Sequence, residues 1–209
     1  MKMMYRVLGL LLLTFTLQSC SSTKLVTRWA DPDWNGGHLH KVLVIGLFKD
    51  DLMRRHFEDE FVTELIAKGR QAEASYVLMP DLQKYKDEKQ LKTVVEKTGA
   101  DAVLITSLKD IENRKTYVPP RVEYAPSPTM WGAYGYYGYY MQTMTPVYTP
   151  GYTRSNKVVQ LETRVFAVKN KEMIWAGITE SFNPSSSGEV IRELAATVVS
   201  DMKKSGFIQ

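Results

Sequence analysis

The acidic segment that follows Trp29 has the spacing closest to that of a metal site. Residues 31–36, Asp-Pro-Asp-Trp-Asn-Gly, match the first half of a calcium loop, in which alternate oxygens and a glycine turn surround a hard cation. The second half fails, because Val42 occupies the position of the bidentate glutamate and begins an apolar run typical of a strand. We therefore expect a turn that leads into the first core strand, with Trp29 and Trp34 packed on the domain, and no metal site.

Three histidines complete the set of candidate catalytic or metal-binding side chains. His38 and His40 would point the same way from an extended segment, but a zinc site needs a third protein ligand, and His56 is expected on the exposed side of a helix. The sequence contains no HExxH, GxGxxG or Walker motif and no GxSxG around a serine. A hydrolase of envelope polymers would have to use Asp31, Asp33 and the two loop histidines. We predict instead no enzyme, no cofactor and no metal.

Charge gives little support for a nucleic-acid-binding protein. The chain of 209 residues carries a formal net charge of +4, and removal of residues 1–19 leaves 25 basic and 23 acidic residues. Nucleic-acid binding requires a basic stripe interleaved with aromatic side chains, and the aromatic segment here has no basic residue. Arg54, Arg55 and Glu58 lie three and four positions apart, which predicts a solvated ion-pair face of a helix rather than a catalytic carboxylate.

The N-terminus has the features of a bacterial lipoprotein signal. Lys2 and Arg6 precede an apolar run of 11 residues (7–17), which is short of the ~20 needed to span a bilayer as a helix. Residues 17–20, Leu-Gln-Ser-Cys, resemble a lipobox, so we predict a signal peptide over 1–19, diacylglycerol on the thiol of Cys20 and further acylation, such as palmitate. Ser21 is not aspartate, and in the enterobacterial-type lipoproteins that this N-terminus resembles this implies export to the periplasmic face of the outer membrane.

Residues 20–40 are expected to be the lipidated cysteine and its tether, whose reach from residue 21 is at most about 70 Å. The remaining residues, 41–209, are expected to form one domain. Apolar periodicity and capping residues predict strands and helices in the order β-α-β-α-β. The three strands are expected at 41–48, 74–79 and 102–108, with helices starting near Asp50 and Asp87 and ending at Gly69 and Gly99.

A change of periodicity after residue 157 predicts an antiparallel hairpin of 158–168 and 173–182, followed by a C-terminal helix capped at Ser186 and closed at Gly206. The fold class is therefore α/β, with a single mixed sheet and helices packed on it.

An unusual insertion lies between these halves. Residues 124–153 contain eight Tyr, four Pro and four Gly but no Lys, Arg, Asp, Glu or His. A flexible excursion, an adhesive surface and a membrane-inserting hairpin all fit this composition. We predict a partner-binding surface for an envelope protein or a glycan, with homo-oligomers possible. The candidate side chains are Trp131, Tyr134, Tyr136, Tyr137, Tyr139 and Tyr140.

Several short motifs give a resemblance to a group of uncharacterised proteobacterial outer-membrane lipoproteins. They are W-x-D-P at 29–32, KVLVIG at 41–46, R-R-x-F-E at 54–58, S-Y at 75–76, G-A-D-A-V-L at 99–104, the Tyr-rich insertion and E-M-I-W at 172–175. The order of elements is also similar to that of the amino-terminal domain of TolB and of the curli-secretion lipoprotein, in architecture only.

The resemblance implies no activity. We expect an anchored, non-catalytic binding or envelope-assembly module, with a subunit of an oligomeric secretion channel as the alternative.

Overall fold

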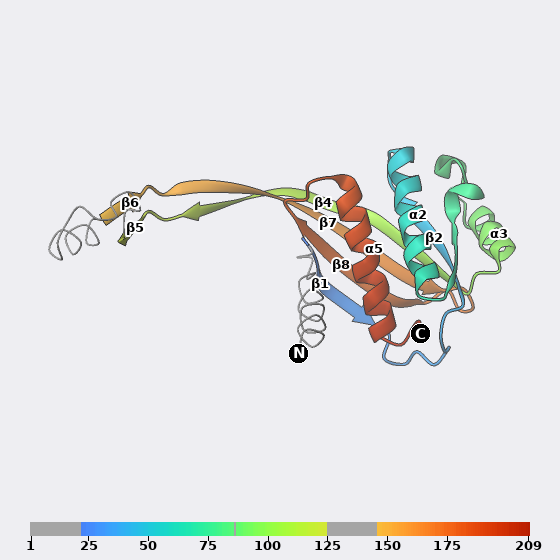
Figure 1. Cartoon of the computed structure of the whole chain (residues 1–209). Coiled ribbons are helices and arrows are strands. Elements are labelled where there is room, and N and C mark those ends of the chain that lie inside the picture. The colour runs from blue at the N-terminus through green and yellow to red at the C-terminus, as the bar shows by residue number, and fades with distance from the viewer. Residues whose placement is uncertain (1–21, 86, 125–145) are drawn as a thin grey trace, which may run out of the picture. The chain divides into compact units, whose positions relative to one another are not determined.

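The computed structural model describes residues 22–85, 87–124 and 146–209, and the chain divides into two compact units. Unit 1 comprises the residues up to Ile111 together with Val158–Gln209, and unit 2 comprises Glu112–Lys157. A sheet of six strands in the order β1-β8-β7-β4-β2-β3 forms the centre of unit 1 (Figure 1). The strands of this sheet are β1 (Thr23–Ala30), β2 (Lys41–Leu47), β3 (Gln71–Ala74), β4 (Ala102–Val118), β7 (Tyr152–Ala167) and β8 (Met173–Phe182).

The sheet is mixed, as the sequence predicts. β2 pairs in parallel with both β3 and β4, whereas β8 pairs antiparallel with β7 and with β1. The apolar run of β2 is buried on both faces from Val42 to Ile45, which is the environment that its aliphatic composition requires. The predicted hairpin of 158–168 and 173–182 is confirmed as part of β7 and all of β8.

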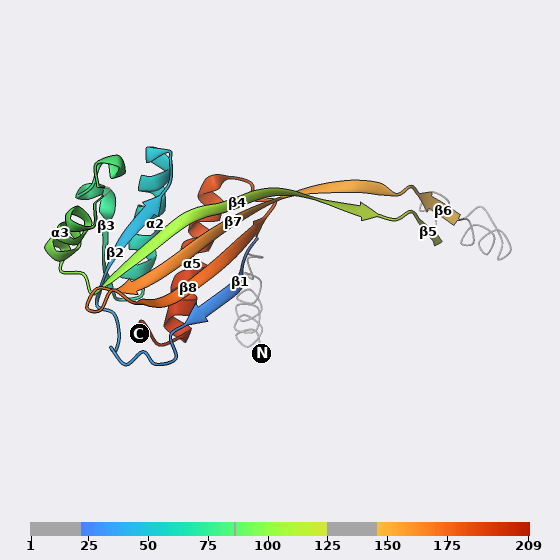
Figure 2. The ribbon, with the colours of Figure 1, turned by 180° about the vertical axis from the view of Figure 1, so that it is seen from behind.

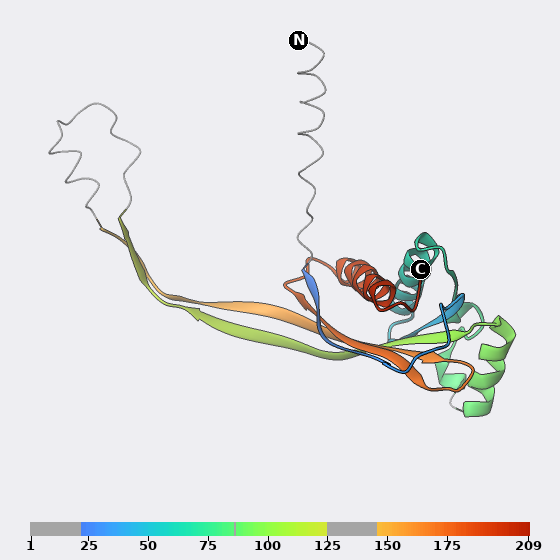
Figure 3. The same ribbon diagram turned by 90° about the horizontal axis from the view of Figure 1, so that it is seen from below.

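Helices cover the two faces unequally. α2 (Asp51–Ala67) and α5 (Ser187–Lys204) lie on one face, and α3 (Glu88–Thr98) lies on the other (Figure 3). Beneath α2 and α5 the main core includes Phe57, Phe61 and Trp175, and the indole of Trp175 donates to Asp201 of α5 over 3.0 Å. Beneath α3 a smaller core gathers around Leu43 and Ile45. Among the helices of the described residues, none covers β7, β8 and β1 on the face opposite α5 (Figure 2).

The predicted helix ends are confirmed. Asp50 accepts a hydrogen bond from the backbone of Met53, and Ser186 accepts one from Glu189. Gly69, Gly99 and Gly206 follow the three helices with φ between 63° and 80°, where a side chain would be strained. The apolar residues spaced three and four positions apart along α5 are buried: Val190, Ile191, Leu194, Val198 and Met202.

Two predictions about local structure are wrong. Residues 74–79 do not form a strand, because β3 ends at Ala74 and a 3₁₀ turn (Ser75–Val77) follows, with Ser75 held by buried charged side chains. The segment expected to be tether contains β1, which pairs with β8 along its whole length through one register shift between Leu25 and Thr27.

Unit 2 is a ribbon of two strands. Within it, β5 (Arg121–Tyr124) pairs antiparallel with β6 (Pro146–Thr149), and the outer parts of β4 and β7 belong to the same unit. The two strands of the ribbon approach each other closely between β6 and β7, because a Cβ on Gly151 would lie 2.7 Å from the hydroxyl of Tyr117 and 2.8 Å from the ring of Pro120. Only glycine fits this position without displacing either neighbour.

Candidate functional site

The acidic and histidine residues near the N-terminus do not converge. Asp31 accepts a hydrogen bond from the backbone of Asp33 over 3.0 Å, which makes a local turn, and the side chain of His38 contacts the carbonyl oxygen of Gly206. His40 is exposed and donates its backbone N–H to Asp101. Among the described residues, no group of three or more His, Cys, Asp or Glu side chains lies close enough to hold a metal ion.

The neighbouring tryptophans differ in environment. Trp34 packs against Phe207 with ring centroids 6.3 Å apart, as expected. Trp29 is 43% exposed on the uncovered side of β1, so the expectation that it packs on the domain is wrong. Its partner across the strands is Ala176, whose side chain is too small to cover an indole.

The predicted solvated ion-pair face of α2 is also wrong for two of its three residues. Arg54 and Glu58 are 2% and 0% exposed, and the guanidinium donates to the carboxylate over 2.9 Å. Glu58 also accepts from the Ser75 hydroxyl and from the backbone N–H groups of Gly46 and Tyr76, at 2.8–3.0 Å. With both carboxylate oxygens of Glu58 engaged, this cluster ties α2 to β2 and to the turn after β3.

The third residue of that face behaves as predicted. Arg55 forms an exposed ion pair with Asp51 over 2.9 Å and lies over the ring of Tyr76, 5.0 Å from its centroid. The hydrogen bond from the Tyr76 hydroxyl to Asp59 raises the pKa of Tyr76, because the neutral phenol is the donor.

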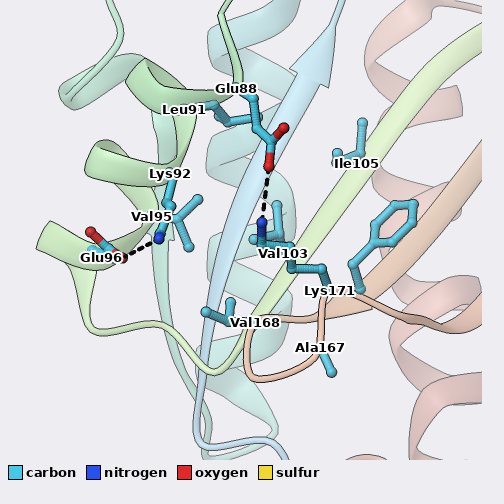
Figure 4. A pocket seen from close by; sticks show the side chains of 11 residues that line it. Glu88, Leu91, Lys92, Val95, Glu96, Val103, Ile105, Ala167, Val168 and Lys171 are labelled. Atoms are coloured by element: carbon cyan, nitrogen blue, oxygen red, sulfur yellow. Dashed lines mark hydrogen bonds and ion pairs between the residues drawn. The ribbon is translucent and has the colours of Figure 1, made fainter.

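An apolar pocket lies between α3 and the sheet, on the face opposite α2 and α5 (Figure 4). Its volume is about 300 Å³. The apolar part of its lining comes from α3, β4 and the end of β7, and consists of Leu91, Val95, Val103, Ile105, Phe166, Ala167 and Val168.

Charged side chains form the rim of this pocket. Lys171, from the turn between β7 and β8, donates to Glu88 over 2.9 Å, and Lys92 pairs with Glu96 at 3.6 Å (Figure 4). The pairing lowers the pKa of Glu88 and raises the pKa of Lys171, because each charge stabilises the other. The rim is therefore neutral, and the lining contains no Ser, Thr, Cys or His that could act as a nucleophile.

The ribbon of unit 2 has two unlike faces. In the register of β5 and β6, Val122 lies opposite Tyr148, and both side chains are more than half exposed, at 53% and 64%. Arg121 and Thr149 lie opposite each other on the other face, where Arg121 pairs with Glu123 at 3.1 Å. Within the described part of the chain, Val122 and Tyr148 thus expose apolar surface on the first face of a two-stranded sheet, which cannot build a core of its own.

The six predicted partner-binding side chains of the insertion, and the predicted lipidation site Cys20, lie outside the described residues. Within the parts of the chain that the structure describes, no helix has both the length and the apolar character of a membrane span.

Sequence reasoning missed Val122 and Tyr148. The alternation of Arg121, Val122 and Glu123 is a strand signal of period two, but it is only a few residues long.

Comparisons with known proteins give only partial structural matches, at low sequence identity. No family model matches the sequence, and no curated protein matches it. A PelC dodecamer from Paraburkholderia phytofirmans has a TM-score of 0.45 and 12% identity, over 85% of this chain and 96% of that one. Lipoprotein GNA1162 from Neisseria meningitidis has a TM-score of 0.40 and 14% identity, over 79% and 99% of the two chains. A PDZ domain protein from Parabacteroides distasonis has a TM-score of 0.37 and 11% identity, over 88% and 35%.

Proposed function

We propose that this protein is a lipid-anchored, non-catalytic assembly module of the bacterial envelope, held at the outer membrane through Cys20, and that copies of it associate through unit 2. The observation that supports self-association is the uncovered apolar face of the ribbon, on which Val122 and Tyr148 lie opposite each other. The lipobox at residues 17–20 supports the anchor.

The composition of the insertion (124–153) favours a second copy of the chain over other partners. Two identical amphipathic ribbons can pack face to face at the ~10 Å spacing of stacked sheets, and the apolar face of each ribbon then shields the apolar face of the other from water. The insertion adjoining this face has no charged residue, so bringing two copies together neither buries nor opposes charges. A charged glycan or protein surface would gain no ion pair from it.

The size of the contact requires more than the ribbon alone. β5 and β6 have four residues each, whereas a standard interface uses ~20–30 residues on each side. The insertion of thirty residues (124–153) is of that size. We therefore expect the whole insertion to contribute to self-association, with Val122 and Tyr148 at one border of the contact.

The experiment is a mass measurement on the mature lipidated protein in detergent, by light scattering during gel filtration. Val122→Asp places a charge on the apolar face, and Thr149→Asp places the same charge on the opposite face, across from Arg121. We expect wild type and Thr149→Asp to share one oligomeric mass and Val122→Asp to be monomeric.

Three outcomes of this measurement would count against the proposal. A monomeric wild-type protein refutes self-association. A Val122→Asp protein that keeps the wild-type mass places the contact elsewhere. If Val122→Asp and Thr149→Asp lower the oligomeric mass equally, the added charge is responsible and not the face on which it lies. Circular dichroism of the variants ensures that both are folded.

A further inference from the structure

The strands of unit 1 bring several chain ends to one end of its sheet. β2 and β4 are parallel, β7 runs opposite to β4 and to β8, and β1 runs opposite to β8 (Figure 2). Three strands therefore finish at the end of the sheet where β1 begins. They are β2, β8 and the part of β4 that belongs to unit 1. α2 and α5 begin at this end, because they follow β2 and β8 after short turns. We call it the anchor end and define it by Ser22, Leu47, Leu52, Leu108 and Phe182.

The position of Ser22 restricts where a lipid on Cys20 can be. The backbone N–H and hydroxyl of Ser22 donate to Glu193 of α5 at 3.2 and 2.9 Å, and its carbonyl oxygen accepts from the backbone of Phe182 at 3.0 Å. Cys20 is two residues away along the chain, so the two Cα atoms are separated by no more than ~7 Å in any conformation. The ~70 Å of reach expected for a tether of residues 21–40 therefore does not exist, because the chain is already bonded to the domain at Ser22 and continues directly into β1.

Large apolar side chains are exposed at this same end. Leu52, in the first turn of α2, is 77% exposed, and Leu47 and Leu108 are 50% and 47% exposed. Leu47 ends β2, which is four strand positions away from β1, or ~19 Å across the sheet. The anchor and these leucines are thus spread across one end of unit 1 rather than gathered at one point.

The acidic residues at the anchor end have partners within the chain. Asp50 caps α2, Asp51 pairs with Arg55, and Asp110 accepts from the backbone of Ile111. The exposed lysines 49 and 109 have long aliphatic stems that can lie along an apolar surface while the ammonium group stays in water.

We infer that the anchor end of unit 1 lies directly on the lipid bilayer, with Leu52, Leu47 and Leu108 inserted among the lipids at the interface. The inference rests on the proposed lipidation of Cys20. The lipid supplies the binding energy that keeps the protein at the membrane. Because the anchored domain is then at a high effective concentration at the bilayer, the weaker contacts of the leucines are enough to set its orientation. A second point of contact ~19 Å from the anchor stops the domain from tilting freely about one edge.

α2 provides a matched pair of probe positions for the test. Leu52 and Ile66 are both exposed, at 77% and 56%, and lie at opposite ends of this helix, ~21 Å apart along its axis. Leu52→Cys and Ile66→Cys each give a single reactive thiol, because Cys20 is the only cysteine of the chain and its sulfur carries the lipid. Each lipidated variant is labelled with a fluorophore and incorporated into phospholipid vesicles, some of which carry a nitroxide quencher on the acyl chain.

We expect the nitroxide lipids to quench the label at position 52 at least twofold more than the label at position 66. Equal quenching, or stronger quenching at position 66, would overturn the inference, as would a label at position 52 that is already shielded before vesicles are added, which would indicate a protein occupant. Flotation separates this result from a failure of the anchor: protein that does not float with the vesicles overturns both, whereas floating protein with an unquenched Leu52→Cys label overturns only the inference.

Discussion

The buried pair of Arg54 and Glu58 allows a quantitative prediction about stability. Replacing Glu58 with alanine leaves the Arg54 guanidinium without its counter-ion in a site where it is 2% exposed. Breaking a buried ion pair from one side costs about 3–5 kcal/mol. The backbone N–H groups of Gly46 and Tyr76 also lose their acceptor, at about 1–3 kcal/mol each if no water replaces it. Because such costs are not additive, we expect a loss of at least about 4 kcal/mol.

The same helix provides a control. Glu64 pairs with Lys68 at 3.4 Å, with its side chain 27% exposed, so Glu64→Ala should cost no more than about 1 kcal/mol. Urea unfolding of the mature chain without lipid, followed by circular dichroism, gives both values.

A double variant, Arg54→Leu with Glu58→Leu, tests the origin of the loss. It removes both charges together. Its loss of unfolding free energy should therefore be smaller than the losses of Arg54→Leu and Glu58→Leu added together. A loss below about 1 kcal/mol for Glu58→Ala, equal to that of the control, would refute the reasoning.

Three further predictions concern the anchor, metal ions and pH. Cys20→Ala should leave unprocessed precursor, seen as a larger species by mass spectrometry, and a processed soluble product would contradict lipidation. EDTA should leave the melting temperature unchanged, because Asp31 bonds within its own turn and Val42 is buried in the sheet; a rise of many degrees on adding calcium would restore the metal site. Hydrogen bonds from the hydroxyl and backbone of Ser185 hold the pKa of Glu189 below its usual 4.5, so its contribution to stability is present above that pH and is lost as the pH falls through the lowered value. The stability difference between wild type and Glu189→Gln should therefore shrink on acidification below pH 4.5, and a difference that grows would contradict the assignment.

Sequence reasoning succeeds here where the signal is local. The aliphatic run of β2 and the capping residues Asp50 and Ser186 report directly on burial and on helix starts, and the structure has them as predicted. The hairpin of β7 and β8 is likewise predicted from two strand-like runs and the short turn-like interval between them.

It fails where the determining partner is distant in sequence. Arg54 and Glu58 have the spacing of a surface pair. Their buried hydrogen-bond partners, Gly46, Ser75 and Tyr76, all lie outside the helix, and Ser75 is 17 residues after Glu58. In β1 polar and apolar residues come in pairs and do not alternate, and its pairing with β8 joins residues such as Thr23 and Ser181, which are 158 positions apart. β4 continues well past Leu108 through a polar sequence. This outer part of the strand belongs to unit 2, where it lies beside β7 and not in a hydrophobic core, so it needs no apolar pattern. No short window of sequence contains these interactions.

Photo-crosslinking in intact cells tests the central claim most directly. A photoreactive amino acid replaces Tyr148, which is 64% exposed on the apolar face of the ribbon, and the same substitution at Thr149 on the opposite face is the control. Self-association predicts a covalent product at Tyr148 that contains two copies of this chain and is lost in the Val122→Asp background. A dominant adduct with a different envelope protein or with a polysaccharide, and no product of two copies, would contradict the proposed function.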